Sequence, residues 1–266
     1  MSFLEAIFLG LLQGFTEFLP VSSSGHLVIF EHLLGISQPG ITFEVLVHFG
    51  TMLSILVVFW EDLVALIGGL FKKNRGQKKL FFLLLVATAV TGFIGLAMGA
   101  FLKGLFEEPA ITGFMLLITG FAVYLTARLG KYPGGKGIEK MSYMDALATG
   151  VFQGIAIIPG ISRSGSTILA SLFRGLKRQA AIKYSFLLAL PAIFGATLLE
   201  AVDIVRLGEI PAYLSLYLLA TALAFISGII AIKLFIRLLN KGKFHYFSYY
   251  CWAMGAFSIV YFLVLK

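Results

Sequence analysis

The chain has 266 residues, of which 59% are hydrophobic and 13% are charged, and its formal net charge at pH 7 is +8. A soluble domain carries about 25% charged residues, so this composition excludes a soluble globular protein and indicates an integral membrane protein. The positive charges are spread over short loops between apolar stretches. Their distribution argues against a nucleic-acid partner and favours contacts with membrane lipids.

The first predicted element is a helix-turn-helix that enters the membrane and leaves on the same side. Residues 3 to 19 are apolar, but Pro20 and the polar turn at residues 22 to 25 stop that helix. The next apolar piece, 27 to 36, is too short, because a helix needs about 20 apolar residues to cross the hydrocarbon core. We therefore expect a re-entrant element here.

Three crossing helices are predicted next, and a second re-entrant element follows them. The crossings are expected at residues 41 to 60, 80 to 101 and 110 to 128. Residues 143 to 158 then form an apolar helix that Pro159 stops, and the apolar piece from 167 to 173 is again too short to cross. Ser142 and Asp145 have the spacing of a capping box at the start of this helix.

Three more crossings complete the pattern, at residues 183 to 202, 211 to 236 and 246 to 265. The expected fold is an all-α polytopic membrane protein with six transmembrane helices and two re-entrant helix-turn-helix elements. We expect a single membrane domain over residues 1 to 266, built from two repeats, 1 to 130 and 142 to 266. Because three crossings separate the re-entrant elements, these enter from opposite faces and the repeats have inverted topology.

The positive-inside rule orients this arrangement. On the predicted topology one face receives seventeen Lys and Arg residues, in the segments 72 to 79, 128 to 140, 174 to 183 and 233 to 243. The other face receives three, which are Lys103, Arg206 and Lys266. We therefore expect the first re-entrant element to open to the outside and the second to the cytoplasm, with both termini outside.

Two similar strings form the two turns. They are QGFTEFLPVSSSGH at residues 13 to 26 and QGIAIIPGISRSGS at residues 153 to 166. Each turn is rich in hydroxyls and glycine and opens a helix whose N-terminal amides point back at it, which is typical of a phosphate cradle. Ordinary helix capping would account for about two of the hydroxyls. The candidate binding residues are Ser22, Ser24, Gly25, Ser162, Ser164, Gly165, Ser166 and Thr167.

Two ionisable side chains are expected at the depth of these turns. Arg163 belongs to the second turn and Glu17 precedes the first, and each costs about 2.5 to 3.5 kcal/mol to place near the bilayer centre. One interpretation is that they only pair and hold the two halves together. The other is that Arg163 grips a phosphate and Glu17 holds a divalent metal ion. His26, directly after the first turn, is a candidate general acid, base or nucleophile.

The two motifs, in this order, resemble those of undecaprenyl-diphosphate phosphatase, the bacitracin-resistance family of integral membrane enzymes. The resemblance implies hydrolysis of a polyprenyl diphosphate lipid, with Mg²⁺ or Ca²⁺ required, in a bacterial-type plasma (inner) membrane and at a site open to the outer face. The family's catalytic positions map onto Glu17, Ser23, His26 and Arg163. Gln13, a further candidate binding residue, stands where many members have glutamate, which leaves Glu17 as the only carboxylate of the first motif.

The nucleophile stays open among Ser23, His26 and water, with Ser23 favoured, and a homodimer is also left open. Inverted repeats with broken helices are transporter architecture too, so an anion or lipid-phosphate transporter or flippase is the alternative function. An acid phosphatase on a membrane anchor is weaker, because the lysine-led and final His/Asp motifs of that class do not occur. Glu44 and His48, four residues apart, indicate either a mutually satisfied pair or a supporting role beside the site.

Overall fold

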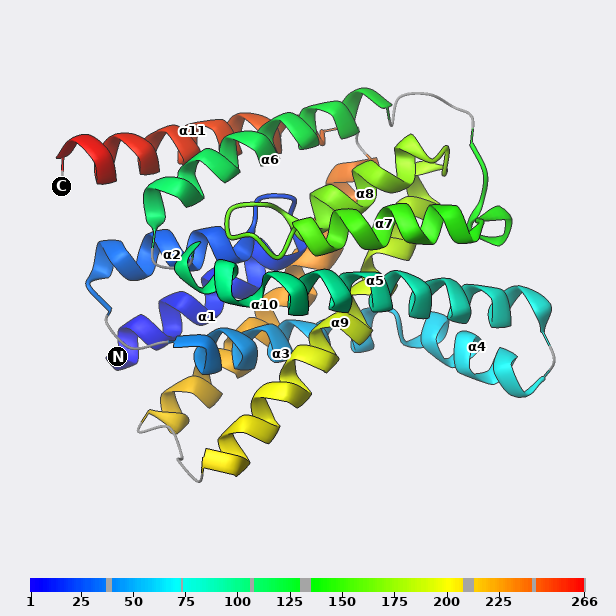
Figure 1. Ribbon diagram of the computed structural model, residues 1–266, viewed down its shortest axis with the longest axis horizontal. Coiled ribbons are helices and arrows are strands. Elements are labelled where there is room, and N and C mark those ends of the chain that lie inside the picture. Colours follow the sequence, from blue (N-terminus) through cyan, green and yellow to red (C-terminus); the bar gives the residue numbers. More distant parts are fainter. Residues whose placement is uncertain are drawn as a thin grey trace.

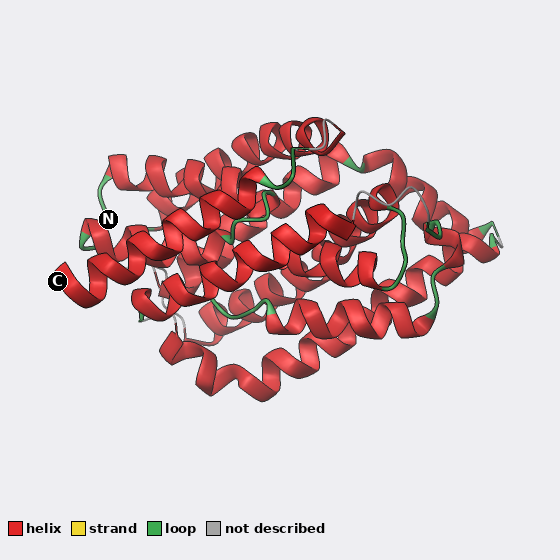
Figure 2. Cartoon of the chain, turned by 90° about the horizontal axis from the view of Figure 1, so that it is seen from above, coloured by secondary structure: helices red, strands yellow, loops and turns green. Residues whose placement is uncertain are grey.

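The computed structural model describes residues 1–36, 40–72, 74–105, 108–129, 135–207, 213–240 and 243–265. Figure 2 shows helices joined by short loops and turns, without a β-sheet in this described part. The helices are α1 (Phe3–Phe18), α2 (Ser23–Leu34), α3 (Gly40–Val58), α4 (Trp60–Phe71), α5 (Arg75–Leu105), α6 (Pro109–Leu129), α7 (Tyr143–Ile155), α8 (Arg163–Phe173), α9 (Arg178–Leu207), α10 (Leu214–Asn240) and α11 (Tyr246–Val260), with a 3₁₀ turn at Ile138–Lys140 and a π-helical turn at Tyr261–Leu265.

Within the described residues, five helices are long and apolar enough to cross a membrane, and a sixth span results if α3 and α4 count as one bent segment. The five are α5, α6, α9, α10 and α11 with its π-helical extension. They coincide with five of the six predicted crossings, and the sixth prediction, residues 41 to 60, coincides with α3. The chain is therefore a multi-pass, all-helical membrane protein.

Helix α4 was not predicted from the sequence, because the search was for apolar runs long enough to cross a membrane. It starts directly after α3, and the two helices are bent by 77° relative to each other. Its first turn carries Glu61 and Asp62, whose charges suit a helix N-terminus, and its Gly69 packs against Gln77 of α5. With 12 residues α4 is too short to cross a bilayer alone, so a search for spans of about 20 residues overlooks it.

Two helix-turn-helix pairs occur where they were predicted, α1 with α2 and α7 with α8. Their helices have 16, 12, 13 and 11 residues, which corresponds to about 16 to 24 Å against a hydrocarbon core of about 30 Å. Ser142 and Asp145 form the predicted capping box of α7, and Ser2 and Glu5 form another at the start of α1. Each of these four helices is thus too short to span a bilayer alone.

Each pair packs on a helix from the other half of the chain. Helix α1 lies against α10 and α7 lies against α5, while α3 contacts α9 and α6 contacts α11 (Figure 1). Small residues permit these close approaches. A Cβ atom at Gly10 of α1 would lie 2.5 Å from the carbonyl oxygen of Ala220, and one at Gly150 of α7 would lie 2.7 Å from that of Ala87. The two halves are therefore interlocked.

The largest apolar cluster lies beside the C-terminal end of α1. Phe18 packs edge-on against Phe186 of α9 with ring centroids 5.8 Å apart, and Phe186 packs against Phe235 of α10 at 5.9 Å. All three rings are fully buried. Because Phe18 directly follows Glu17, this core fixes the part of α1 that carries the candidate carboxylate.

Both termini lie at one end of the molecule, and the start of α5 and the end of α6 lie at the other end (Figure 1). Those two helix ends carry predicted members of the cation-rich face, among them Arg75, Lys78 and Arg128. Other members of the two predicted sets fall outside the described residues or have side chains that are not described; they are Lys73, Lys103, Lys131, Arg206, Lys241 and Lys266.

Candidate active site

The turns of the two helix-turn-helix pairs touch each other through glycine. A Cβ atom at Gly25 would lie 2.8 Å from the Cα atom of Gly160, so only glycine fits this contact. Gly160 itself has a φ of +91°, which residues with side chains rarely adopt. Thr119 of α6 holds the second turn, because its hydroxyl donates to the carbonyl oxygen of Gly160 (2.7 Å) and accepts from the amide of Ser162 (2.9 Å). The two similar strings thus form one site.

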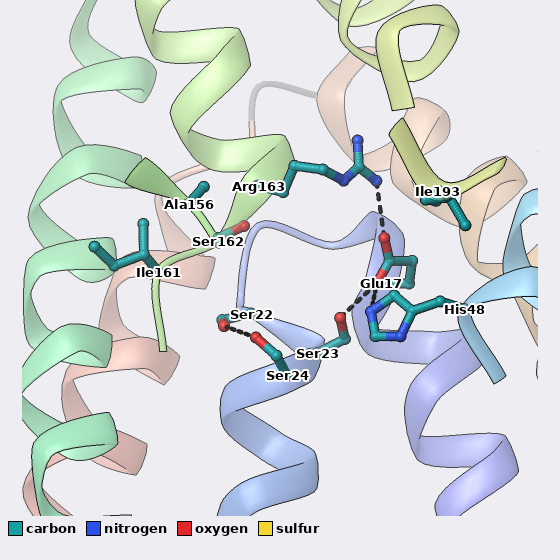
Figure 3. A pocket seen from close by; sticks show the side chains of 10 residues that line it. All are labelled: Glu17, Ser22, Ser23, Ser24, His48, Ala156, Ile161, Ser162, Arg163 and Ile193. Carbon is teal, nitrogen blue, oxygen red and sulfur yellow. Dashed lines mark hydrogen bonds and ion pairs between the residues drawn. The ribbon is translucent and has the colours of Figure 1, made fainter. Parts of the chain in front are cut away.

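A cavity of about 80 Å³ lies where the turns meet (Figure 3). It has room for more than one water-sized group, since one such group takes about 10 to 15 Å³ of this volume. Both halves of the chain contribute to its wall. The lining residues are Glu17, Ser22, Ser23, Ser24, His48, Ala156, Ile161, Ser162, Arg163 and Ile193.

Glu17 is the centre of the polar contacts in this cavity. Its Oε1 atom accepts a hydrogen bond from Arg163 Nη2 at 2.9 Å, and its Oε2 atom accepts from Ser23 Oγ at 2.5 Å and from Gln13 Nε2 at 3.1 Å. His48 Nε2 lies 3.3 Å from the same Oε2 atom. A hydroxyl next to a carboxylate that can take its proton is the arrangement that activates an oxygen nucleophile.

Arg163 is the first residue of α8 and enters the cavity from the second half of the chain. The ion pair with Glu17 that one interpretation predicted does form, and the two side chains are only 15% and 4% exposed. The pair leaves the Nη1 atom of Arg163 buried and without a hydrogen-bond partner among the described residues. Buried donors are normally satisfied, so this nitrogen indicates a missing acceptor, and an anion such as phosphate is a suitable one.

Two serines cap the helices that start at the turns. Ser22 Oγ accepts from the amide of Gly25 in α2 at 3.3 Å, and Ser162 Oγ accepts from the amide of Gly165 in α8 at 3.1 Å. Capping thus involves about as many hydroxyls as expected. Ser22 has a φ of +65°, a strained conformation for a residue other than glycine, and strain of this kind collects at functional sites.

Three of the nine predicted binding residues line the cavity and six do not. Thr167 illustrates the second group, because its hydroxyl donates to the carbonyl oxygen of Arg163 at 2.9 Å and lies 2.5 Å from Ser185 Oγ, which ties α8 to α9. The lining residues are Ser22, Ser24 and Ser162. The others are Gln13, Gly25, Ser164, Gly165, Ser166 and Thr167.

His26 is fully buried and is not part of the cavity wall. Its Nδ1 atom lies 2.7 Å from the carbonyl oxygen of the strained residue Ser22, and its Nε2 atom lies 2.7 Å from the hydroxyl of Tyr250 in α11. Because a carbonyl oxygen only accepts, Nδ1 carries the hydrogen and Nε2 accepts from the tyrosine. In this geometry His26 supports the first turn. No sequence pattern connects it with Tyr250, 224 residues away.

His48 is the cavity residue that motif reasoning did not place in the site. Its spacing from Glu44 suggested a pair or a supporting role, and the structure puts its imidazole against Glu17. The contact with Glu44 is to the backbone, since His48 Nδ1 lies 2.7 Å from that carbonyl oxygen. The available signal was an ionisable residue inside a predicted crossing, which is a functional candidate by default.

The donors for a metal ion are few. Among the described residues, no three His, Cys, Asp or Glu side chains converge in a way that could hold a metal. Glu17 is the one carboxylate in the cavity wall, and the Oε1 atom of its neighbour Gln13 is buried with no partner in the described structure. Mg²⁺ is commonly held by one or two carboxylates together with substrate phosphates, and one carboxylate with a free amide oxygen fits that pattern.

A polar cluster at the start of α7 anchors the second helix-turn-helix pair. Buried Asp145 accepts from Lys136 Nζ at 2.5 Å, from Arg174 Nε at 2.8 Å and from the amide of Ser142 at 2.7 Å. Burial alone would raise the pKa of Asp145, but these hydrogen bonds outweigh it and lower the pKa to about 2. Since Arg174 follows the last residue of α8, the cluster ties the two ends of the pair together and fixes the helix that presents Arg163.

Comparison with known proteins gives matches over nearly the whole chain. A family model described as bacitracin resistance protein BacA matches residues 6–257. An undecaprenyl-diphosphatase of Halothermothrix orenii is 48% identical over 261 residues, which cover 98% of each chain. Undecaprenyl-diphosphatases of Syntrophotalea carbinolica and Methanococcus vannielii are 44% and 38% identical, over 96% and 97% of this chain and 97% and 100% of theirs.

Proposed function

Because this chain belongs to the bacitracin resistance protein BacA family, we propose that it is an undecaprenyl-diphosphatase, which hydrolyses undecaprenyl diphosphate to undecaprenyl phosphate and inorganic phosphate. The reaction recycles the lipid carrier of cell-wall synthesis. The observation that carries the proposal is the cavity in which the Glu17 carboxylate lies between the Ser23 hydroxyl and the Arg163 guanidinium.

The cavity attracts the negative charge of the diphosphate. Arg163 supplies Nη1, the buried donor that lacks a partner. Helices α2 and α8 both begin at the cavity, and the partial positive charge of a helix N-terminus favours an anion. The hydroxyl of Ser24 caps no helix and lies 3.4 Å from Ser22 Oγ, and it can donate to a phosphate oxygen in place of that contact.

Ser23 is the nucleophile in this mechanism. Glu17 Oε2 takes the hydroxyl proton while Ser23 Oγ attacks the terminal phosphorus, and the bond from phosphorus to the bridging oxygen breaks. Glu17 passes the proton to the leaving oxygen, and undecaprenyl phosphate departs. A water molecule then attacks the phosphoserine, Glu17 takes a proton from this water and returns it to Ser23 Oγ, and inorganic phosphate is released.

Magnesium or calcium is the proposed cofactor. Glu17 and the free Oε1 atom of Gln13 would hold the ion together with oxygens of the diphosphate. When bound, it supplies positive charge that offsets the charge of the diphosphate. Chelation should abolish hydrolysis, and Gln13→Leu should raise the metal concentration needed for half-maximal rate, because it removes one oxygen ligand.

We place the protein in the plasma (inner) membrane as two inverted repeats, with α1–α2 and α7–α8 as re-entrant elements. The packing supports this arrangement. In the proposed repeats α7 corresponds to α1 and α10 corresponds to α5, and the contact of α1 with α10 has its counterpart in the contact of α7 with α5. The same correspondence relates α3 to α9 and α6 to α11, and each of these pairs is in contact. A pseudo-twofold axis in the membrane plane has this effect.

The proposed orientation has the termini and the opening of the first element outside. A cysteine introduced at Glu108 should react with an impermeant thiol reagent added outside intact cells, and one at Asn74 should not. The native Cys251 is buried and should stay silent. Labelling at Asn74 without labelling at Glu108 would reverse the orientation.

The function is tested by phosphate release from undecaprenyl diphosphate in detergent with divalent metal. Detergent solution has no second compartment and no transmembrane gradient, so transport cannot account for the release. Glu17→Gln and Ser23→Ala should each abolish release, because they remove the base and the nucleophile. Glu61→Gln and Ser258→Ala are matched controls outside the cavity wall and should retain the parent rate. A folded wild-type protein that binds the lipid but releases no phosphate would contradict the phosphatase and favour the transporter alternative.

A further inference from the structure

The position of one oxygen atom decides whether the proposed base meets the proposed nucleophile. Glu17 Oε2 has three neighbours, Ser23 Oγ at 2.5 Å, Gln13 Nε2 at 3.1 Å and His48 Nε2 at 3.3 Å. Glu17 Oε1 has Arg163 Nη2 at 2.9 Å. If Oε2 turned away from Ser23, the serine hydroxyl would lose its acceptor in the cavity.

Two side chains from outside α1 hold the Glu17 carboxylate, and they come from different helices. Gln13 belongs to α1 and moves with Glu17, so it cannot fix the carboxylate relative to the rest of the site. Arg163 comes from α8 and holds Oε1. With Arg163 alone, the carboxylate could still turn about its terminal bond. The contact from His48 of α3 supplies the second fixed point, at Oε2.

The imidazole of His48 is itself held in a fixed direction. Its Nδ1 atom lies 2.7 Å from the carbonyl oxygen of Glu44, one helical turn earlier in α3, and this carbonyl can only accept. The ring is thereby aimed with Nε2 at the cavity, and Figure 3 shows it beside Glu17 and close to Ser23. A carboxylate oxygen also only accepts, so His48 donates to Glu17 from Nε2, and with a hydrogen on both ring nitrogens it is the imidazolium form that makes these two contacts.

We propose that His48 is a positioning residue for the hydrolysis, whose Nε2 donor holds Oε2 of Glu17 against the hydroxyl of Ser23. This assignment rests on the proposed function of the cavity. His48 touches neither the phosphorus nor the leaving oxygen in this role. It acts through Glu17, so its loss should slow the chemical step and leave the Arg163 side of the site able to bind the diphosphate.

The test compares two side chains of equal length at position 48. His48→Gln keeps a donor that can reach Glu17, whereas His48→Met has none. We expect kcat of the methionine variant to fall at least about tenfold with KM changed less than about threefold, and kcat of the glutamine variant to stay within about threefold of the parent. The pattern of rescue by glutamine is what a purely space-filling role would not give.

A matched control is available one helix away. His32 of α2 makes the same kind of contact, with its Nδ1 atom 2.8 Å from the carbonyl oxygen of Val28, but it does not line the cavity. His32→Met should therefore retain the parent kcat. Thermal unfolding in detergent checks that each variant is folded.

Parent-like turnover in folded His48→Met would overturn the proposal, and so would a glutamine variant as slow as the methionine variant. If His48→Met does not fold, the glutamine variant decides alone. A folded His48→Gln whose kcat is more than about tenfold below that of the parent contradicts a donor role. These results are separate from those for the function itself. An active parent that is silenced by Glu17→Gln but not by His48→Met would keep the phosphatase and remove only the role of His48.

Discussion

Replacing Arg163 by lysine tests whether the guanidinium does more than pair with Glu17. In the structure Nη2 of Arg163 donates to Glu17 Oε1 at 2.9 Å, while Nη1 is buried without a partner among the described residues. Lysine keeps the positive charge but has one nitrogen, which cannot serve the carboxylate and a phosphate oxygen as a planar fork does. The change should therefore remove one charge-assisted hydrogen bond from the bound phosphoryl group.

Such a bond contributes about 1.5 to 3 kcal/mol. At about 1.4 kcal/mol per factor of ten, kcat/KM of Arg163→Lys should fall by roughly 10- to 150-fold. The assay is phosphate release from undecaprenyl diphosphate under saturating metal. Arg174→Lys is the matched control, because Arg174 pairs with Asp145 outside the cavity and its side chain is 43% exposed. If Arg163→Lys worked as well as the parent while Arg174→Lys did too, Arg163 would be a structural ion-pair partner and the phosphate-binding assignment would be wrong.

Three further predictions concern the remaining parts of the site. Ser23→Ala should lose hydrolysis yet keep affinity for the diphosphate within about tenfold in a lipid-binding assay, because the lost oxygen acts mainly in the transition state; loss of binding instead would make Ser23 a binding residue. Tyr250→Phe should lower turnover less than His26→Ala does, since it removes one partner of the imidazole and leaves the contact with Ser22, and equal losses measured by phosphate release would contradict a supporting role for His26. The stabilisation from Asp145, whose pKa is lowered to about 2 from an ordinary 3.8, should be fully present above about pH 4 and be lost as the pH falls towards 2. The difference in unfolding temperature between parent and Asp145→Asn should shrink over that range, and a constant difference would refute the assignment.

The crossings and the two turns could be predicted because they depend on local patterns. Long apolar runs specify α5, α6, α9, α10 and α11, and the prolines with their hydroxyl-rich turns mark the places where α1 and α7 end. The contact between the two turns could be expected from the two similar strings. Three predicted crossings separate these strings, so the two helix-turn-helix pairs were expected to enter from opposite faces and to meet. The ion pair between Glu17 and Arg163 is one of the two interpretations that the sequence supports, because leaving either charge alone in an apolar interior is costly.

The parts that escaped prediction depend on contacts between distant segments. Nothing near His48 in the sequence says that its ring faces Glu17, because the direction of α3 relative to α1 is set by packing in three dimensions. In the same way, Tyr250 reaches His26 only after α11 has packed against the site. Helix α4 was missed for a different reason, since its 12 residues fall below any length that a bilayer requires.

The ion pair at the centre of the site also has a consequence for how the protein is made. Glu17 and Arg163 are 146 residues apart, so Glu17 leaves the ribosome well before its partner exists. Until α8 is synthesised, the newly made first half holds a carboxylate whose burial in lipid costs several kcal/mol. The first helix-turn-helix pair should therefore settle into its final depth only when the second pair arrives, which couples assembly of the catalytic centre to insertion of the second half of the chain.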